Sequence, residues 1–183
     1  NIGALSVRQG QTGAVPADNA TVVRISANLL AESSVGMILT EGDPGTMVHN
    51  SVAGADFLYR NSRLPGNKLL EINAWAQQSD TEGVTGGQKA YGWRVGMPNN
   101  TGWRGDVRFT QLGENFNPGL GFVNRRGIKQ WNFGTQYTRR PREGNIRSML
   151  AGFNGERSEW LDGQLQSQVI RYRLMELESR LGD

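Results

Sequence analysis

The chain has 183 residues, a formal net charge of +3, no cysteine and a mean hydropathy of -0.53. This length allows one ordinary domain or part of a larger one, and the lack of cysteine excludes disulfides, thiolate metal sites and cysteine nucleophiles. No apolar run approaches the ~18 to 20 residues of a membrane-spanning helix, whereas a transmembrane β-barrel stays compatible with low hydropathy because only alternate strand residues face lipid.

The basic residues are unusual because only three of the 20 are lysines, at Lys68, Lys89 and Lys129. Arginine has a planar, forked side chain that suits carboxylate, phosphate and sulfate partners and ladders of ion pairs. The only tight basic cluster, at 139–142, is typical of a turn between strands. Nucleic-acid binding usually shows clustered Lys and Arg. We therefore expect no nucleic-acid partner.

In the first half of the chain, five segments alternate apolar and polar residues with a period of two, which predicts strands with one apolar face. A loop with Gly10, Gly13 and Pro16 follows the first segment, and Glu32-Ser33 predicts a tight hairpin between the second and third. A helix over 28–32 is the local alternative. Asp43-Pro44-Gly45 and Asn61 to Asn67 predict turns. The segments are 3–7, 23–31, 35–40, 53–60 and 70–77.

The second half continues the pattern after a glycine-containing loop at 79–88. Its segments cover 91–97, 103–111, 128–138, 148–154 and a stretch from about Gly163 to Leu177. The alternation becomes irregular at Met175 to Leu177, which predicts a bulge or a short helix. The whole pattern predicts an all-β, antiparallel up-and-down meander of about ten strands, forming a transmembrane β-barrel or a fragment of one.

The connections between these segments alternate in length. Those after the odd-numbered segments are predicted to be long and those after the even-numbered ones short, as in outer-membrane barrels with short periplasmic turns. The longest connection, Gly113 to Gly127, is then extracellular. Aromatic residues lie on the apolar face near strand ends and suit the two lipid interfaces: Tyr59, Tyr91, Trp93, Trp103, Phe109, Trp131 and Tyr137.

The longest connection also carries the motif Glu-Asn-Phe-Asn-Pro-x-x-Gly-Phe-Val, beginning at Glu114, followed by Arg-Arg-Gly. Together with the stretches 1–5, 34–36, 54–56 and 161–163, it resembles a bacterial family of unknown function. That family forms the membrane barrel behind a family-nine carbohydrate-binding-like domain in outer-membrane proteins. The resemblance covers most of the chain, and its loop residues are Glu114, Asn115, Phe116, Asn117, Pro118, Arg125 and Arg126.

The resemblance implies one barrel domain over 1–183 in the outer membrane of a Gram-negative bacterium, as part of a longer chain. It also implies contact with outer-membrane lipid, and with glycans or a larger membrane complex as further partners. A channel or a membrane anchor linked to carbohydrate handling is the function it suggests. No catalytic residue and no cofactor follow from it.

If the apolar face meets lipid, the opposite face lines the barrel interior. An internal ladder of ion pairs is the first interpretation of its charges, and a filter with a modest preference for anions is the second. The residues expected to face the interior are Arg24, Asp56, Arg60, Glu71, Arg94, Arg104, Asp106 and Arg108.

Two other classes stay open on the sequence. In a soluble β-sandwich or small barrel the apolar face would build the core, and Trp75, Phe116 and Trp160 would be exposed for glycan binding. A glycoside hydrolase would need paired acids from Asp80, Glu82 and Glu114. The single histidine, His49, is expected on a solvated loop, and no spacing of metal ligands is present. We therefore expect no enzyme, metal or cofactor.

Overall fold

The computed structural model describes residues 1–11, 17–44, 46 and 48–180, and these form ten β-strands. The strands are Ile2–Gln9 (β1), Asp18–Leu29 (β2), Ser33–Glu41 (β3), Asn50–Leu64 (β4), Lys68–Thr81 (β5), Lys89–Met97 (β6), Gly102–Leu112 (β7), Ile128–Arg139 (β8), Ile146–Trp160 (β9) and Leu165–Ser179 (β10). Within the described residues, no helix is long and apolar enough to cross a membrane.

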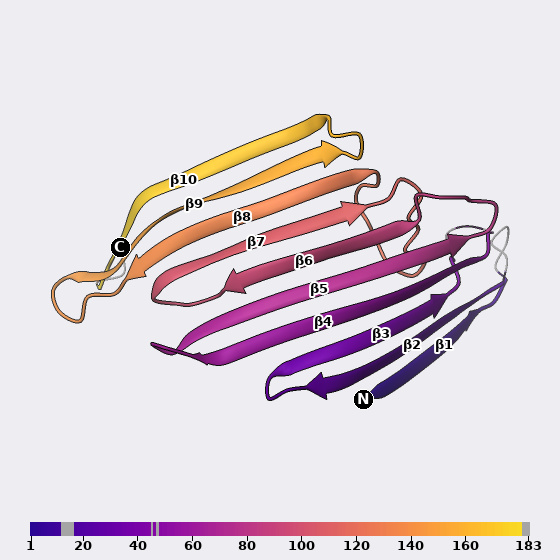
Figure 1. Cartoon of the computed structure of the whole chain (residues 1–183), viewed down its shortest axis with the longest axis horizontal. Coiled ribbons are helices and arrows are strands. Elements are labelled where there is room, and N and C mark those ends of the chain that lie inside the picture. The colour runs from indigo at the N-terminus through magenta and orange to yellow at the C-terminus, as the bar shows by residue number, and fades with distance from the viewer. Residues whose placement is uncertain (12–16, 45, 47, 181–183) are drawn as a thin grey trace. The chain divides into compact units, whose positions relative to one another are not determined.

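Each strand pairs with the next one along the chain, so the strands form one antiparallel meander in the order β1 to β10 (Figure 1). The predicted fold class is therefore confirmed. Every connection joins neighbouring strands, as short links between antiparallel strands allow. Within the described residues β1 and β10 are the outer strands, and closure into a barrel stays a prediction.

Several strand ends and connections differ from the sequence-based expectation. β4 continues to Leu64 and β5 to Thr81, because polar residues at strand ends still pair through their backbones. The hairpin turn lies at 30–32, with Leu30 at a φ of 59°, so the helical alternative for 28–32 is wrong. The connection after β9 covers only 161–164, so the prediction of a long loop there is also wrong.

The irregular stretch near the C-terminus is a bulge and not a helix. The pairing of β10 with β9 changes register between Arg173 and Glu176. Of the predicted turn residues, Gly13, Pro16 and Gly45 lie outside the described residues.

The described chain divides into two compact units. Unit 1 contains 1–59, 73–92 and 110–128, and unit 2 contains 60–72, 93–109 and 129–183. The division crosses several strands, so both units include parts of β4 to β8.

Unit 1 has a small buried core that includes part of the long β7–β8 connection. Val52 of β4, Ala90 of β6 and Phe116 of the connection form its centre, and Trp75, Leu112 and Val123 pack against them. The predicted loop bounds of 113–127 are confirmed, since β7 ends at Leu112 and β8 begins at Ile128. The connection is therefore folded onto the sheet.

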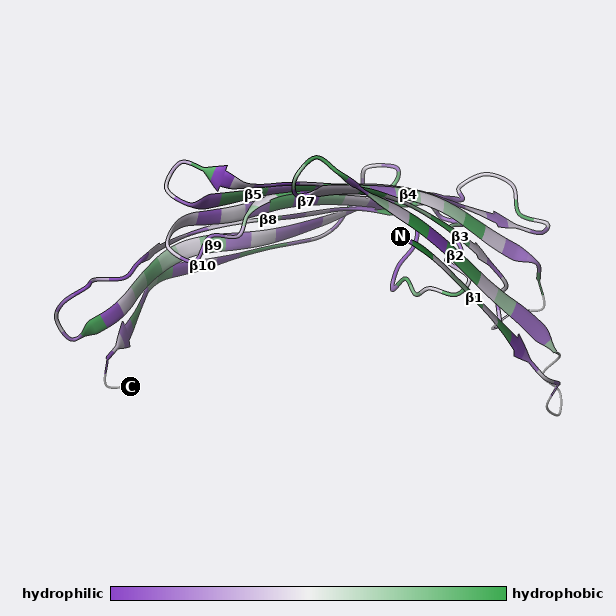
Figure 2. Cartoon of the chain, turned by 90° about the horizontal axis from the view of Figure 1, so that it is seen from below, coloured by the Kyte–Doolittle hydropathy of each residue, from purple (hydrophilic) through white to green (hydrophobic). Residues whose placement is uncertain are grey.

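The apolar face of unit 1 is exposed within the described chain. Ile25 of β2 lies opposite Met37 of β3, which lies opposite Ala55 of β4, so these residues share one face. Met37 is 60% exposed. Figure 2 shows hydrophobic and hydrophilic residues alternating along the strands. In β1 the register places Leu5 opposite Val22, so Leu5 lies on the other face of the sheet.

Unit 2 carries most of the aromatic contacts. Phe109 of β7 and Trp131 of β8 have ring centroids 4.6 Å apart, and Trp93 of β6 lies 5.8 Å from Trp131. Trp103 and Tyr137 pair separately at 5.2 Å. Such tilted and edge-on pairs are favourable beyond their buried area. Nevertheless Trp103 remains 62% exposed, and Trp93 and Tyr137 are exposed as well, so these three rings lie at the surface of the described chain.

Candidate functional site

The polar face of unit 1 contains an ion pair that reaches across a strand. Arg24 of β2 donates to both carboxylate oxygens of Asp56 of β4, at 2.9 and 2.7 Å. The residue between them on β3 is Gly36, where a Cβ would lie 2.6 Å from the Arg24 Nη2 atom and 2.8 Å from an Asp56 oxygen. Glycine at this position therefore gives the two side chains room to meet.

Unit 2 contains two more ion pairs between residues that were expected to face the interior. Arg60 Nε lies 3.6 Å from Glu71 Oε1, and Arg94 Nε lies 3.3 Å from Asp106 Oδ2. Six of the eight predicted interior residues are thus joined in the pairs Arg24–Asp56, Arg60–Glu71 and Arg94–Asp106. This arrangement matches the ladder interpretation of these charges.

Arg104 and Arg108 of β7 are the other two predicted interior residues. Both are exposed, and within the described part of the chain no carboxylate lies within ion-pair distance of either guanidinium. The polar face therefore has more positive than negative charge along β7.

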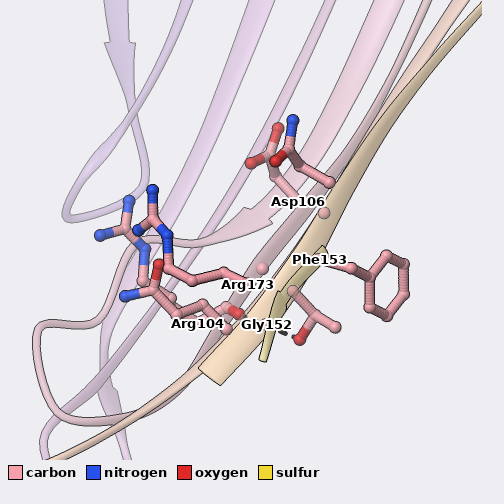
Figure 3. Close-up of a pocket in the computed structure, with 10 residues that line it drawn as sticks. Arg104, Asp106, Gly152, Phe153 and Arg173 are labelled. Carbon is pink, nitrogen blue, oxygen red and sulfur yellow. Dashed lines mark hydrogen bonds between the residues drawn. The ribbon is translucent and has the colours of Figure 1, made fainter. Parts of the chain in front are cut away.

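Arg104 opens onto a groove of about 170 Å³ in unit 2. Its lining comes from four successive strands, and Arg173 of β10 extends in the same direction as Arg104, while Phe153 of β9 extends to the opposite side (Figure 3). Asp106 also lines the groove. The complete lining is Arg104, Gly105, Asp106, Gly134, Thr135, Gln136, Gly152, Phe153, Asn154 and Arg173.

The floor of this groove is formed by glycines. A Cβ at Gly152 would collide with the Thr135 carbonyl oxygen and lie 2.9 Å from the Gln136 Cα. A Cβ at Gly134 would lie 3.2 Å from the Asn154 Cβ. Because Gly134 and Gly152 have no side chains, space remains in the groove between the polar side chains that flank it.

In unit 1, the long connection is held by polar contacts around Asn117. The Asn117 side-chain amide donates to Asp43 Oδ2 at 2.8 Å, and its backbone N–H donates to Ser79 Oγ at 3.0 Å. Asn50 Nδ2 donates to the Asn117 carbonyl at 3.4 Å, and Thr81 Oγ1 donates to Asn50 Oδ1 at 2.6 Å. These bonds join the connection to β4, to β5 and to the β3–β4 connection.

Gly119 has a φ of +57°, and a Cβ there would lie 2.6 Å from Asn50 Nδ2. Both the backbone conformation and the close approach of Asn50 therefore require glycine. The Asn-Pro-Gly sequence allows the chain to turn directly over the buried amide of Asn50.

Phe116 corrects one expectation. We expected an exposed aromatic for glycan binding, but its side chain is 1% exposed and fills the core of unit 1. The adjacent loop residues Glu114, Asn115, Arg125 and Arg126 are exposed, as expected for a loop. Sequence reasoning failed at Phe116 because an isolated aromatic in a glycine-rich loop carries no periodic signal.

Five of the seven predicted interface aromatics form two groups in unit 2, whereas Tyr59 and Tyr91 belong to unit 1. Phe109, Trp93 and Trp131 contact one another, whereas Trp103 pairs with Tyr137 near the β6–β7 turn. From Trp103 to Phe109 the strand rises by roughly 20 Å at ~3.4 Å per residue. Barrels that span an outer membrane have aromatic girdles on both sides of an apolar band ~25 Å tall.

The candidates for acid or metal chemistry all have exposed side chains. His49 is exposed on a connection, as expected, and Asp80, Glu82 and Glu114 are exposed. Among the described residues, no group of three or more histidine, cysteine or acidic side chains is placed to hold a metal ion.

Comparison with known proteins gave no match. No family model, curated protein or solved structure is similar to this chain. The resemblance of the loop motif to the membrane-barrel family stays a prediction.

Sequence analysis missed several residues that build these features. Gln136, Asn154 and Arg173 line the groove, and Asn50 and Ser79 hold the long connection. A signal for the groove is present in the sequence, since Gly134 and Gly152 both fall on the polar side of their strands. The buried role of Asn50 and Ser79 has no local signal, because their partners are far away in the chain.

Proposed function

We propose that the chain forms all or part of a bacterial outer-membrane β-barrel that acts as a channel or a membrane anchor. The observation that carries this proposal is the exposure of large apolar side chains along one face of the strands other than β1, including Met37, Trp103 and Tyr172. Soluble proteins rarely expose large continuous apolar patches. In a barrel, lipid covers this face and the aromatic groups lie at the interfaces.

The opposite face supports the same proposal. Its charges are arranged in the pairs Arg24–Asp56, Arg60–Glu71 and Arg94–Asp106, which suits a hydrated interior. Arg104 and Arg108 add positive charge without an acidic partner in the described chain. Because lumen charges tune ion preference, we propose a modest preference for anions if the barrel conducts.

The location is tested on the natural full-length protein. Membrane fractionation should leave it in the outer membrane until detergent is added, and its mobility on a gel should change between unheated and boiled samples. A protein that is soluble without detergent and has unchanged mobility would contradict the proposal. The exposed apolar face would then be covered by another protein layer.

The ion preference is tested by reversal potentials in planar bilayers under a salt gradient. Neutralising both Arg104 and Arg108 with glutamine should shift the reversal potential toward cation preference. Arg142→Gln removes the same charge from the β8–β9 connection and provides the control. Cation selectivity of the unmodified protein would refute the anion preference, whereas a barrel without conductance would favour the anchor.

Glycan binding is the alternative function, and carbohydrate handling by a barrel rests on the resemblance of the loop motif alone. Trp160 at the end of β9 is exposed and favours this alternative, while Trp75 is half-buried and Phe116 is buried. If the protein is soluble and is retained on a column of immobilised glycan, and if Trp160→Ala abolishes this retention, glycan binding becomes the leading function.

A further inference from the structure

The groove in unit 2 combines two guanidinium groups with two side-chain amides. Arg104 comes from β7, Gln136 from β8, Asn154 from β9 and Arg173 from β10. The two arginines extend to the same side of the sheet (Figure 3). The Gln136 Nε2 atom donates to Thr138 Oγ1 at 3.0 Å, so this amide is held in place at the wall of the groove.

The charges around the groove are positive overall. Its one acidic lining residue, Asp106, accepts a hydrogen bond from Arg94 Nε at 3.3 Å, so Arg94 balances this carboxylate. Arg104 has no carboxylate at ion-pair distance within the described residues. The groove therefore holds one positive charge that is not offset by a neighbouring acid.

Arg173 has only a weak partner. Its Nε atom lies 3.3 Å from Glu176 Oε2, and the two side chains are 57% and 62% exposed. Such exposed ion pairs contribute little, because solvent screens the charges and both long side chains lose freedom. The register change between Arg173 and Glu176 places this pair at the bulge of β10. An anion in the groove would compete with Glu176 for Arg173.

We propose that this groove is a binding site for a small oxyanion, namely a carboxylate, phosphate or sulfate group. Guanidinium forks match the planar or tetrahedral oxygens of these groups, and charge-assisted hydrogen bonds are the strong ones. The amides of Gln136 and Asn154 supply neutral polar groups for attached hydroxyls. The volume of about 170 Å³ suits one small anion or the acidic end of a larger molecule.

This site differs from a general preference for anions because it depends on a defined set of side chains. It goes beyond the proposed channel, since the same groove would bind an anion whether its face lines a lumen or meets bulk solvent. Binding and membrane location are therefore separate measurements. Loss of one does not imply loss of the other.

The test is calorimetric titration of the natural full-length protein at low ionic strength, in detergent if extraction requires it. The probes are inorganic phosphate and glucuronate, with glucose as the uncharged counterpart of glucuronate. We expect phosphate, glucuronate or both to bind, and glucose to bind at least tenfold more weakly, because the charge-assisted bonds are absent. If only phosphate or only glucuronate binds, the result shows whether the groove accepts a phosphate or a carboxylate group.

Three variants separate the groove from general electrostatics. Arg104→Gln should weaken anion binding about tenfold through loss of a charged hydrogen bond. Glu176→Gln should strengthen it about two- to fivefold, since it releases Arg173 from a weak surface pair. Arg108→Gln is the matched control, because Arg108 lies on the same strand and face but does not line the groove. Circular dichroism checks that each variant is folded.

A further variant changes the shape of the groove and not its charge. Gly134→Ala adds a methyl group to the floor, 3.2 Å from the Asn154 Cβ, and should weaken binding as Arg104→Gln does. Equal losses in Arg104→Gln and Arg108→Gln would overturn the proposal, since they would mean attraction by net charge alone. Equal binding of glucose and glucuronate, or no binding of either anion, would overturn it as well.

Discussion

Replacing Phe116 with alanine tests whether the long β7–β8 connection is packed onto unit 1. Phe116 is 1% exposed and packs with Val52 and Ala90, whereas Phe122 of the same connection is 85% exposed. Truncation of a buried phenylalanine costs about 3 to 5 kcal/mol, from lost apolar burial and from the cavity that remains. An exposed phenylalanine should change stability by less than about 0.5 kcal/mol. Phe122→Ala is therefore the matched control.

The connection also supplies its own reporter, since Arg125 and Arg126 are exposed tryptic sites next to the packed segment. If the connection opens locally, a loss of about 3 kcal/mol raises the open population on the order of a hundredfold. Tryptic cleavage under native conditions should accelerate accordingly in Phe116→Ala, and urea unfolding should report any global loss. Equal cleavage rates in Phe116→Ala and Phe122→Ala would refute the packing argument.

The remaining predictions concern polar contacts. A double-mutant cycle on Arg24 and Asp56, read by urea unfolding, should give a coupling of about 1 kcal/mol or less, because the side chains are 44% and 30% exposed. Gly36→Ala should remove most of this coupling, since the new Cβ occupies the path of the ion pair, and an unchanged coupling would contradict that geometry. Asn117→Ala should cost about 1 to 3 kcal/mol and speed tryptic cleavage, because it removes the side-chain hydrogen bonds from Asn117 to Asp43 and from the Gly119 N–H to Asn117. Asn124→Ala, at an exposed position of the same connection, should leave both measurements unchanged.

The strands could be predicted because their signal is local. Trp103 to Gln111 alternates clearly, and β7 forms there with one residue added at each end. Strand ends such as Asn61 to Leu64 carry no alternation of their own, yet they pair because the backbone of the adjacent strand continues. The local sequence therefore predicts where the strands lie more accurately than where they begin and end.

The polar pairs were harder, because they depend on register. The sequence placed Arg24 and Asp56 on the same polar side, but their contact depends on the alignment of β2, β3 and β4. A shift of one residue in any strand would turn its side chains to the other face. For Arg94 and Arg60, the sequence likewise placed acidic residues on the same face but did not show which acid each arginine contacts. Asn50 and Ser79 could not be assigned, since their roles arise only where distant connections meet.

The glycine at position 36 has a consequence for how the sheet assembles. The Arg24–Asp56 pair joins two strands that are not neighbours, and it passes over the one position of β3 that has no side chain. A one-residue slip of β3 would place Val35 or Met37 between the two charges and separate them. The pair thus forms only after three strands have aligned correctly. It therefore stabilises the native alignment during folding and does not stabilise misaligned hairpins.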